Sequence, residues 1–177
     1  MTHQLTQKER MLLSDQLSHE EICIQKYSGY AEKAKDPAVR NMFNQFAREE
    51  QNHYNMLNQF LGGQMSGEQG SQVQQGGQAG KAGSLQGSGF TLNFGESQVQ
   101  GRYVAGDQAK ADQQDSSMLQ DMLMTEKYVS GTYDTAIFET VNPTIRQSLQ
   151  HIQEDEQKHG EAIAKYMKEH GMYQVQQ

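Results

Sequence analysis

The sequence predicts an all-α protein, a four-helix bundle made of two duplicated antiparallel helical hairpins. Apolar residues recur every three or four positions over four segments, the spacing of amphipathic helices. The two halves also repeat at one constant shift of 106 positions, the distance from Glu50 to Glu156. Other pairs that share this shift are Glu20 and Glu126, Tyr27 and Tyr133, Pro37 and Pro143, and Arg40 and Arg146.

The first hairpin is expected over residues of about 6–35 and 37–61. Thr6 and Glu9 have the spacing of a capping box, which favours a helix start at this point. Asp36 followed by Pro37 is typical of an N-cap and the first position of a second helix. Gly62 and Gly63 then end that helix.

The second hairpin is expected over residues of about 113–141 and 143–170. Asn142 followed by Pro143 repeats the cap and proline of the first turn. His170 and Gly171 supply a polar last turn and a glycine stop. Arg40 and Arg146 each follow a turn proline by three residues, and we expect them to hold the turns.

A long Gly/Gln-rich crossover, about residues 62–111, separates the two hairpins. Thirteen of the 17 glycines lie here, and apolar residues are sparse. Such a composition cannot offset its ordering entropy by burial, so we expect a low-complexity insert within one domain over residues 1–177. Residues 90–94 and 99–104 are the exception, because they could form a short strand, a hairpin or a docking patch.

Composition excludes several classes of function. The net charge of −7 argues against binding to nucleic acid or to an anionic membrane. One cysteine, Cys23, excludes a disulfide within the chain. No apolar run approaches the length of a membrane span, and the N-terminus lacks the apolar block of a signal peptide. We therefore expect synthesis in the cytoplasm and no membrane span.

Six residues are predicted to converge on a site inside the bundle. Glu50 and His53 lie three positions apart on one helix, and Glu156 and His159 repeat this pair. Glu20 and Glu126 lie within the apolar stripes of the other two helices, where an unpaired charge is unfavourable. In each hairpin the two glutamates lie about 15 residues, or roughly 22 Å, from the turn between them, and so at one level.

These ligand types predict two divalent metal ions, with iron or manganese the best match. Four carboxylates balance the charge of two such ions, and mixed oxygen and nitrogen ligation suits both metals. Glu50 and Glu156 would bridge the ions, Glu20 and Glu126 would be terminal ligands, and His53 and His159 would bind one ion each. Glu49 and Asp155 would orient the histidine of the facing helix. The alternative is a relic site whose polar groups only pair with one another in the core.

Two kinds of residue near the predicted site have simpler interpretations. Tyr27 and Tyr133 are expected to be core aromatics with a hydrogen bond, or otherwise donors or radical traps at the site. Cys23 is expected to be a small buried residue rather than a ligand or redox thiol.

The second hairpin resembles the spore coat protein F (CotF) family of endospore-forming bacteria. The resemblance rests on Asp121-x-Leu-x-x-x-Lys127, Tyr133 in mid-helix, Asn142-Pro-x-x-Arg146 and Gly171-x-Tyr173. It implies a ferritin-like fold and a role in the spore coat, with other coat proteins or further copies of this chain as partners. The acid-Glu-x-x-His pairs also resemble those of rubrerythrins, manganese catalases and plant acyl desaturases.

These observations leave two main hypotheses for the function. The first is a structural or assembly role in the spore coat, with metal ions joining the hairpins. The second is a di-iron or di-manganese oxidoreductase acting on peroxide or dioxygen: catalase-like, peroxidase-like or ferroxidase. The chain lacks the cysteine pairs of a rubredoxin-like electron donor, so manganese catalase or metal oxidation fits this hypothesis better. Metal storage is a third and weaker hypothesis, since it would require a cage.

Overall fold

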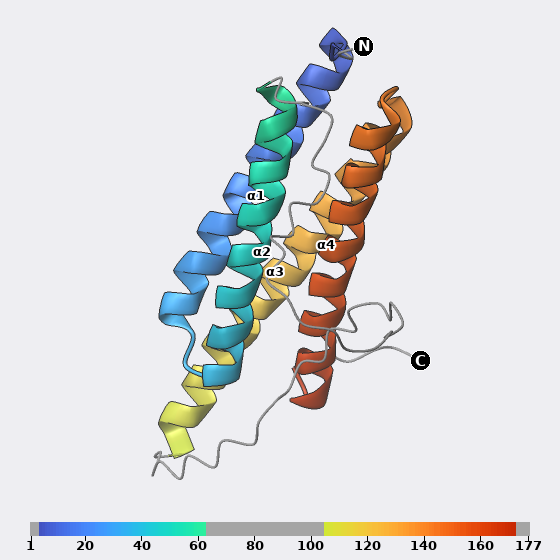
Figure 1. The fold of residues 1–177 in the computed structure, drawn as a ribbon. Coiled ribbons are helices and arrows are strands. Elements are labelled where there is room, and N and C mark those ends of the chain that lie inside the picture. Colours follow the sequence, from blue (N-terminus) through green and yellow to red (C-terminus); the bar gives the residue numbers. More distant parts are fainter. Residues whose placement is uncertain (1–3, 63–104, 173–177) are drawn as a thin grey trace, which may run out of the picture. The chain divides into compact units, whose positions relative to one another are not determined.

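The computed structural model describes residues 4–62 and 105–172, with the backbone alone for residues 105–112. These residues form four helices: α1 (Gln7–Lys33), α2 (Pro37–Leu61), α3 (Ala105–Glu139) and α4 (Pro143–Glu169). Figure 1 shows α1 lying along α2 and α3 lying along α4, each pair joined by a tight turn. The described residues contain no strand, so the predicted all-α bundle of two hairpins is confirmed. The predicted apolar segments at 90–94 and 99–104 lie outside the described residues.

The helix starts follow from their capping residues. Thr6 and Glu9 form the predicted capping box, in which each side chain bonds the backbone N–H of the other residue. Asp36 and Asn142 accept from the first backbone N–H groups of α2 and α4, and a proline occupies the first turn of each helix. These contacts fix both turns at the predicted positions.

The third helix begins earlier than its sequence pattern indicates. The expected start was near residue 113, whereas α3 begins at Ala105. Residues 105–112 include three alanines and a lysine, which are strong helix formers. Apolar periodicity cannot detect such a segment, because it reports burial and not helix propensity.

The core is apolar at both ends and polar in the middle. On α1, Leu13 precedes the buried Glu20, and Tyr27 and Ala31 follow it. The other three helices repeat this order, with a buried glutamate between apolar residues. The fold thus places four acids in one interior layer.

The two hairpins hold each other through their turns. Glu9 Oε1 accepts from the backbone N–H groups of Val141 and Asn142, at 2.9 and 3.2 Å. Asp115 accepts from those of Lys35 and Asp36, at 3.0 and 2.7 Å. Both acids are almost fully buried, and they too are 106 positions apart. An acid of α1 and an acid of α3 therefore each fix the turn of the opposite hairpin.

Each turn also has an internal brace from its arginine. Arg40 donates to the carbonyl oxygen of Ala34 at 2.7 Å, and Arg146 donates to that of Thr140 at 2.6 Å. The expectation that these arginines hold the turns is confirmed. Their carbonyl partners lie at the ends of α1 and α3, where backbone acceptors have no intrahelical donor.

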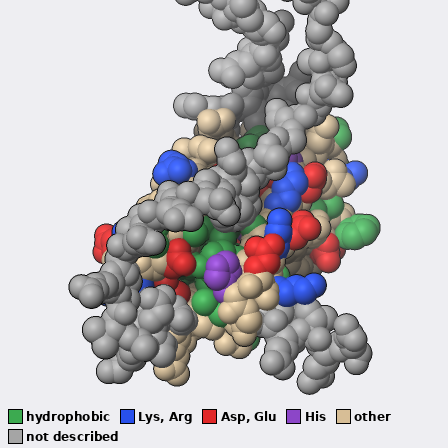
Figure 2. Space-filling view, turned by 90° about the horizontal axis from the view of Figure 1, so that it is seen from below, with side chains coloured by type: hydrophobic (Ala, Val, Ile, Leu, Met, Phe, Trp, Pro, Cys, Tyr) green, Lys and Arg blue, Asp and Glu red, His purple; other side chains and the backbone are tan. Residues whose placement is uncertain are grey.

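The outer surface carries mixed charge. On the face shown in Figure 2, acidic and basic side chains lie next to each other around exposed apolar ones. Within the described part of the chain, no helix is long and apolar enough to cross a membrane.

Replacement of Glu9 should lower stability in a pH-dependent manner. Burial raises the pKa of Glu9. The hydrogen bonds from the N–H groups of Thr6, Asn142 and Val141 lower this pKa by a larger amount in total, so the net shift is downward. Its stabilising effect is thus present above the unfolded-state pKa of about 4.3 and is lost as pH falls through the folded-state pKa. We expect Glu9→Gln to lower the free energy of unfolding at pH 7 by about 1–3 kcal/mol, measured by urea denaturation.

The difference between Glu9→Gln and the unmodified chain should shrink as pH falls below about 4, because Glu9 then becomes neutral in both states. Glu32→Gln, at an exposed position of the same helix, is the control and should change stability little. A difference that stays constant from neutral to acidic pH would contradict this account.

Candidate metal centre

All six residues predicted as metal ligands meet in the middle of the bundle. They form two overlapping groups, and in each group one ligand atom per residue lies within 4.8 Å of every other. The first group is Glu20, Glu50, His53 and Glu156. The second group is Glu50, Glu126, Glu156 and His159. Glu50 and Glu156 belong to both groups, as bridging carboxylates would.

The four carboxylates are buried and only partly bonded. Their exposed fractions are at most 1%, and those of His53 and His159 are 4% and 2%. One oxygen of each glutamate, Oε2, has no hydrogen-bond partner. A buried carboxylate oxygen without a partner is costly, and four in one layer are rare in folded proteins. A pair of divalent cations fits this donor set, because it would give each such oxygen a partner.

Each histidine directs its two ring nitrogens to different carboxylates. Nδ1 of His53 lies 3.1 Å from Glu156 Oε1, and Nδ1 of His159 lies 3.1 Å from Glu50 Oε1. These two Nδ1 atoms face the glutamate layer, so they are the ring nitrogens that would bind metal.

The outer nitrogens contact the two acids that precede the shared glutamates. Nε2 of His159 lies 2.7 Å from Glu49, and Nε2 of His53 lies 3.5 Å from Asp155. Each contact runs between α2 and α4, so each acid lies against the histidine of the facing helix, where it was predicted to orient that ring. Proteins commonly fix a metal-binding imidazole with such a carboxylate.

The site holds protons when no cation balances it. Burial lowers the pKa of His159, but Glu49 and Glu50 outweigh this effect and raise that pKa to about 9. Burial also opposes the charge on His53, yet Asp155 and three glutamates raise its pKa. Burial, followed by the charges of Glu156 and Glu50, raises the pKa of Glu126 well above its usual range. A cation that enters this layer would therefore displace protons.

The two buried tyrosines cross between the hairpins. Tyr27 of α1 donates its hydroxyl to Glu126 Oε1, and Tyr133 of α3 donates to Glu20 Oε1. Both rings are fully buried, and Tyr27 packs against Phe43 and Phe46. They are thus core aromatics with a hydrogen bond, as expected, and the acceptor is a glutamate of the site.

The surroundings of the two groups differ despite the duplication. Phe46 stacks on His159 with ring centroids 4.2 Å apart, whereas the residue that matches Phe46 in the second half is Ile152. Cys23 is fully buried and is matched by Val129 in the second half. Burial, followed by the glutamate charges, raises the pKa of Cys23, and the residue is in neither group. This agrees with its interpretation as a small core residue.

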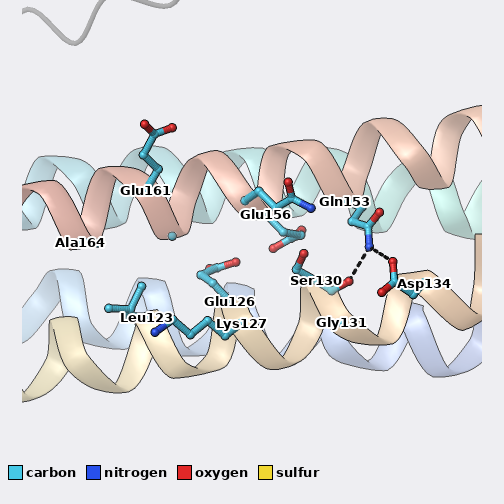
Figure 3. A pocket seen from close by; sticks show the side chains of 12 residues that line it. Leu123, Glu126, Lys127, Ser130, Gly131, Asp134, Gln153, Glu156, Glu161 and Ala164 are labelled. Carbon is cyan, nitrogen blue, oxygen red and sulfur yellow. Dashed lines mark hydrogen bonds between the residues drawn. The ribbon is translucent and has the colours of Figure 1, made fainter. Parts of the chain in front are cut away.

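A pocket of about 510 Å³ between α3 and α4 reaches the site from one side. Figure 3 shows Glu126 and Glu156 pointing toward each other across it, with Ser130, Gly131 and Asp134 along α3. The apolar pattern of the sequence does not predict this pocket. Its signal is the presence of Gly131 and Gly160 inside two amphipathic helices, which a search for apolar periodicity passes over.

Two family models match the chain, one in each half. Residues 114–176 match the Coat F domain. Residues 12–79 match Rubrerythrin, over the stretch that holds Glu20, Glu50 and His53. No curated protein and no solved structure matches the chain.

The two matches confirm the resemblance to the spore coat protein F family and the ferritin-like fold. They also agree with the internal duplication, since the two matched hairpins carry the same acids and histidines at the six predicted ligand positions. The buried carboxylate and histidine groups are compatible with the di-metal site of ferritin-like proteins.

Removal of either buried tyrosine hydroxyl should destabilise the protein. Tyr27→Phe leaves both oxygens of Glu126 without a phenol donor, and Tyr133→Phe does the same to Glu20. We expect each substitution to lower the free energy of unfolding of the metal-free protein by about 1–3 kcal/mol, because a buried carboxylate loses its donor. The ring itself stays packed, so the loss reports the hydrogen bond alone. Urea denaturation measures this loss.

Tyr30→Phe is the matched control for this experiment. Tyr30 is only half-buried and donates to Asp121 at 2.7 Å, so water can replace its hydrogen bond. Its substitution should cost less than either buried one. Losses in Tyr27→Phe and Tyr133→Phe that are no larger than the loss in Tyr30→Phe would contradict this account of the buried hydroxyls.

Proposed function

We propose that this protein is a spore coat component in which a dinuclear iron or manganese centre joins the two hairpins. The observation that carries the proposal is the pair of overlapping carboxylate and histidine groups that share Glu50 and Glu156. The Coat F match to the second hairpin supports the coat role. Other coat proteins, or further copies of this chain, would be its partners.

Each group combines residues from both hairpins. The first takes Glu20, Glu50 and His53 from α1 and α2, and Glu156 from α4. The second takes Glu50 from α2, and Glu126, Glu156 and His159 from α3 and α4. An ion held by either group would connect the hairpins, and its binding free energy would add to the stability of the fold. We treat residues 1–177 as one ferritin-like domain that carries the crossover of about residues 62–111.

An oxidoreductase is the second candidate, favoured by the Rubrerythrin match to the hairpin that carries Glu20, Glu50 and His53. A carboxylate-bridged pair of iron or manganese ions supplies redox chemistry toward peroxide or dioxygen. Oxygen evolution from hydrogen peroxide by the manganese-loaded protein, lost in Glu156→Gln, would favour this candidate. An inactive protein that binds metal and is stabilised by it would favour the structural role.

Metal should stabilise the protein through the six proposed ligands. At a free concentration about 100-fold above Kd, one bound ion adds about 2.7 kcal/mol to the free energy of unfolding. For a chain of this size, this corresponds to a rise in Tm of roughly 5–10 °C, measured by calorimetry on chelator-treated protein with and without Mn²⁺ or Fe²⁺. Glu50→Gln or Glu156→Gln should remove most of the rise, because each deletes a ligand of both groups.

Glu154→Gln is the control for the metal experiment. Glu154 is exposed on α4, two positions from Glu156, and pairs with Lys158 on the surface. This variant should keep the full metal-dependent rise. If the unmodified protein shows no metal-dependent change in Tm and retains no metal, the groups are a relic site of polar residues that pair in the core.

The coat role predicts where the protein is found. It should be present in the coat fraction extracted from purified spores of the organism that encodes it, as detected with a specific antibody. Its recovery only from the spore core or from the vegetative cell would exclude a role in the coat and leave the metal site as a separate question.

A further inference from the structure

The pocket between α3 and α4 ends on two of the proposed ligands. Glu126 and Glu156 line it, and each has a buried Oε2 without a hydrogen-bond partner. Glu126 belongs to the second group alone, and Glu156 belongs to both groups. The pocket therefore connects the outside of this hairpin with the second group.

Small residues in the two helices keep the pocket open. Ser130 and Gly131 of α3 and Gly160 of α4 line it. A Cβ atom on Gly160 would lie 3.7 Å from the Cβ of Glu126, and one on Gly131 would meet no atom within 4 Å. Neither glycine has a positive φ, so space rather than backbone conformation distinguishes these positions. A larger side chain at either position has room to extend into the pocket.

The first hairpin carries large residues at the matched positions. At the constant shift of 106 positions, Tyr54 corresponds to Gly160, Ile24 to Ser130 and Gln25 to Gly131. The two halves therefore share the proposed ligands but carry side chains of different size at these three positions. This difference gives the site two unequal sides.

The pocket attracts cations rather than anions. Asp134 and Glu161 line it together with Glu126 and Glu156, and Lys127 is the one basic residue among the described residues of its lining. Gln153 donates to Asp134 at 2.7 Å and holds that carboxylate in place. A recess with excess negative charge raises the local concentration of divalent cations and their rate of entry.

We propose that divalent cations enter the dinuclear site through this pocket, and that Gly131 and Gly160 keep the path open. The ion would meet Glu126 and Glu156 first, so the second group fills before the first. The inference rests on the proposed function, since it requires that the site binds metal.

The rate of metal uptake tests the route. Co²⁺ is mixed with metal-free protein in a stopped-flow instrument, and its visible absorption reports bound ion. Gly160→Tyr, which copies Tyr54 of the first hairpin, should slow uptake at least tenfold and leave the final number of bound ions unchanged. Gly131→Phe, which places a large side chain in the pocket from α3 instead of α4, should also slow uptake. Gly29→Tyr, at an open glycine of α1 outside the pocket, is the control and should keep the original rate.

The charge of the pocket is tested with Asp134→Asn combined with Glu161→Gln. This variant should take up Co²⁺ several-fold more slowly at low ionic strength, and the difference should disappear in high salt, which screens the lost attraction.

The outcomes separate the entry route from the site itself. Uptake at the original rate in either Gly160→Tyr or Gly131→Phe, with full final binding, would overturn the route and leave the metal site intact. Failure of the unmodified protein to bind Co²⁺, Mn²⁺ or Fe²⁺ would instead overturn the proposed function. Full loss of binding in Gly160→Tyr, with slowed uptake in Gly131→Phe, would still support the route, because the tyrosine would then occupy the site.

Discussion

The burial of four glutamates in an apolar interior is the constraint on which the rest of this structure depends. Glu20, Glu50, Glu126 and Glu156 are almost fully excluded from water, and one oxygen of each has no hydrogen-bond partner. Transfer of such groups from water is unfavourable unless opposite charge or protons compensate them. The two histidines, the two tyrosines and the raised pKa of Glu126 all supply part of this compensation. Two divalent cations would complete it with the ligand types already present.

The hairpins are bound together by exchanged contacts. Glu9 fixes the turn of the second hairpin, and Asp115 fixes the turn of the first. Tyr27 reaches the glutamate of α3, and Tyr133 reaches that of α1. These exchanges act at two levels, the turns and the middle of the bundle. Each hairpin alone would leave a turn and a buried acid without partners, so the duplication is one cooperative unit rather than two modules.

The differences between the halves concern access and packing around a preserved ligand set. Gly160 in place of a tyrosine is accompanied by a pocket on the α3–α4 side, and Phe46 in place of an isoleucine stacks on His159. The second group therefore lies beside a pocket and an aromatic ring, and the residue that matches this ring in the other half is Ile152. A duplicated ligand set with unequal surroundings can give its two ions unequal rates of binding and exchange.

The sequence by itself determined the helical hairpins, their turns and the identity of the six converging residues. Local chemistry fixed the turns, because a cap followed by proline stops one helix and starts the next. The six converging residues followed from the constant shift and from acids inside apolar stripes, because such acids must meet partners in the interior. The start of α3 did not follow, since residues 105–112 show no apolar period in the sequence.

Tertiary structure alone decided which partners meet across the hairpins. Sequence spacing places Glu9, Asp115 and the two tyrosines on helix faces, but the contacts they make depend on how α1 lies against α3. The same holds for the pocket, because the glycines that line it show no preference for a neighbour until two helices pack. Apolar periodicity and helix capping are properties of one chain segment. A carboxylate shared by two groups, a turn bonded by another helix and a pocket between helices each depend on two segments, and only packing brings those segments together.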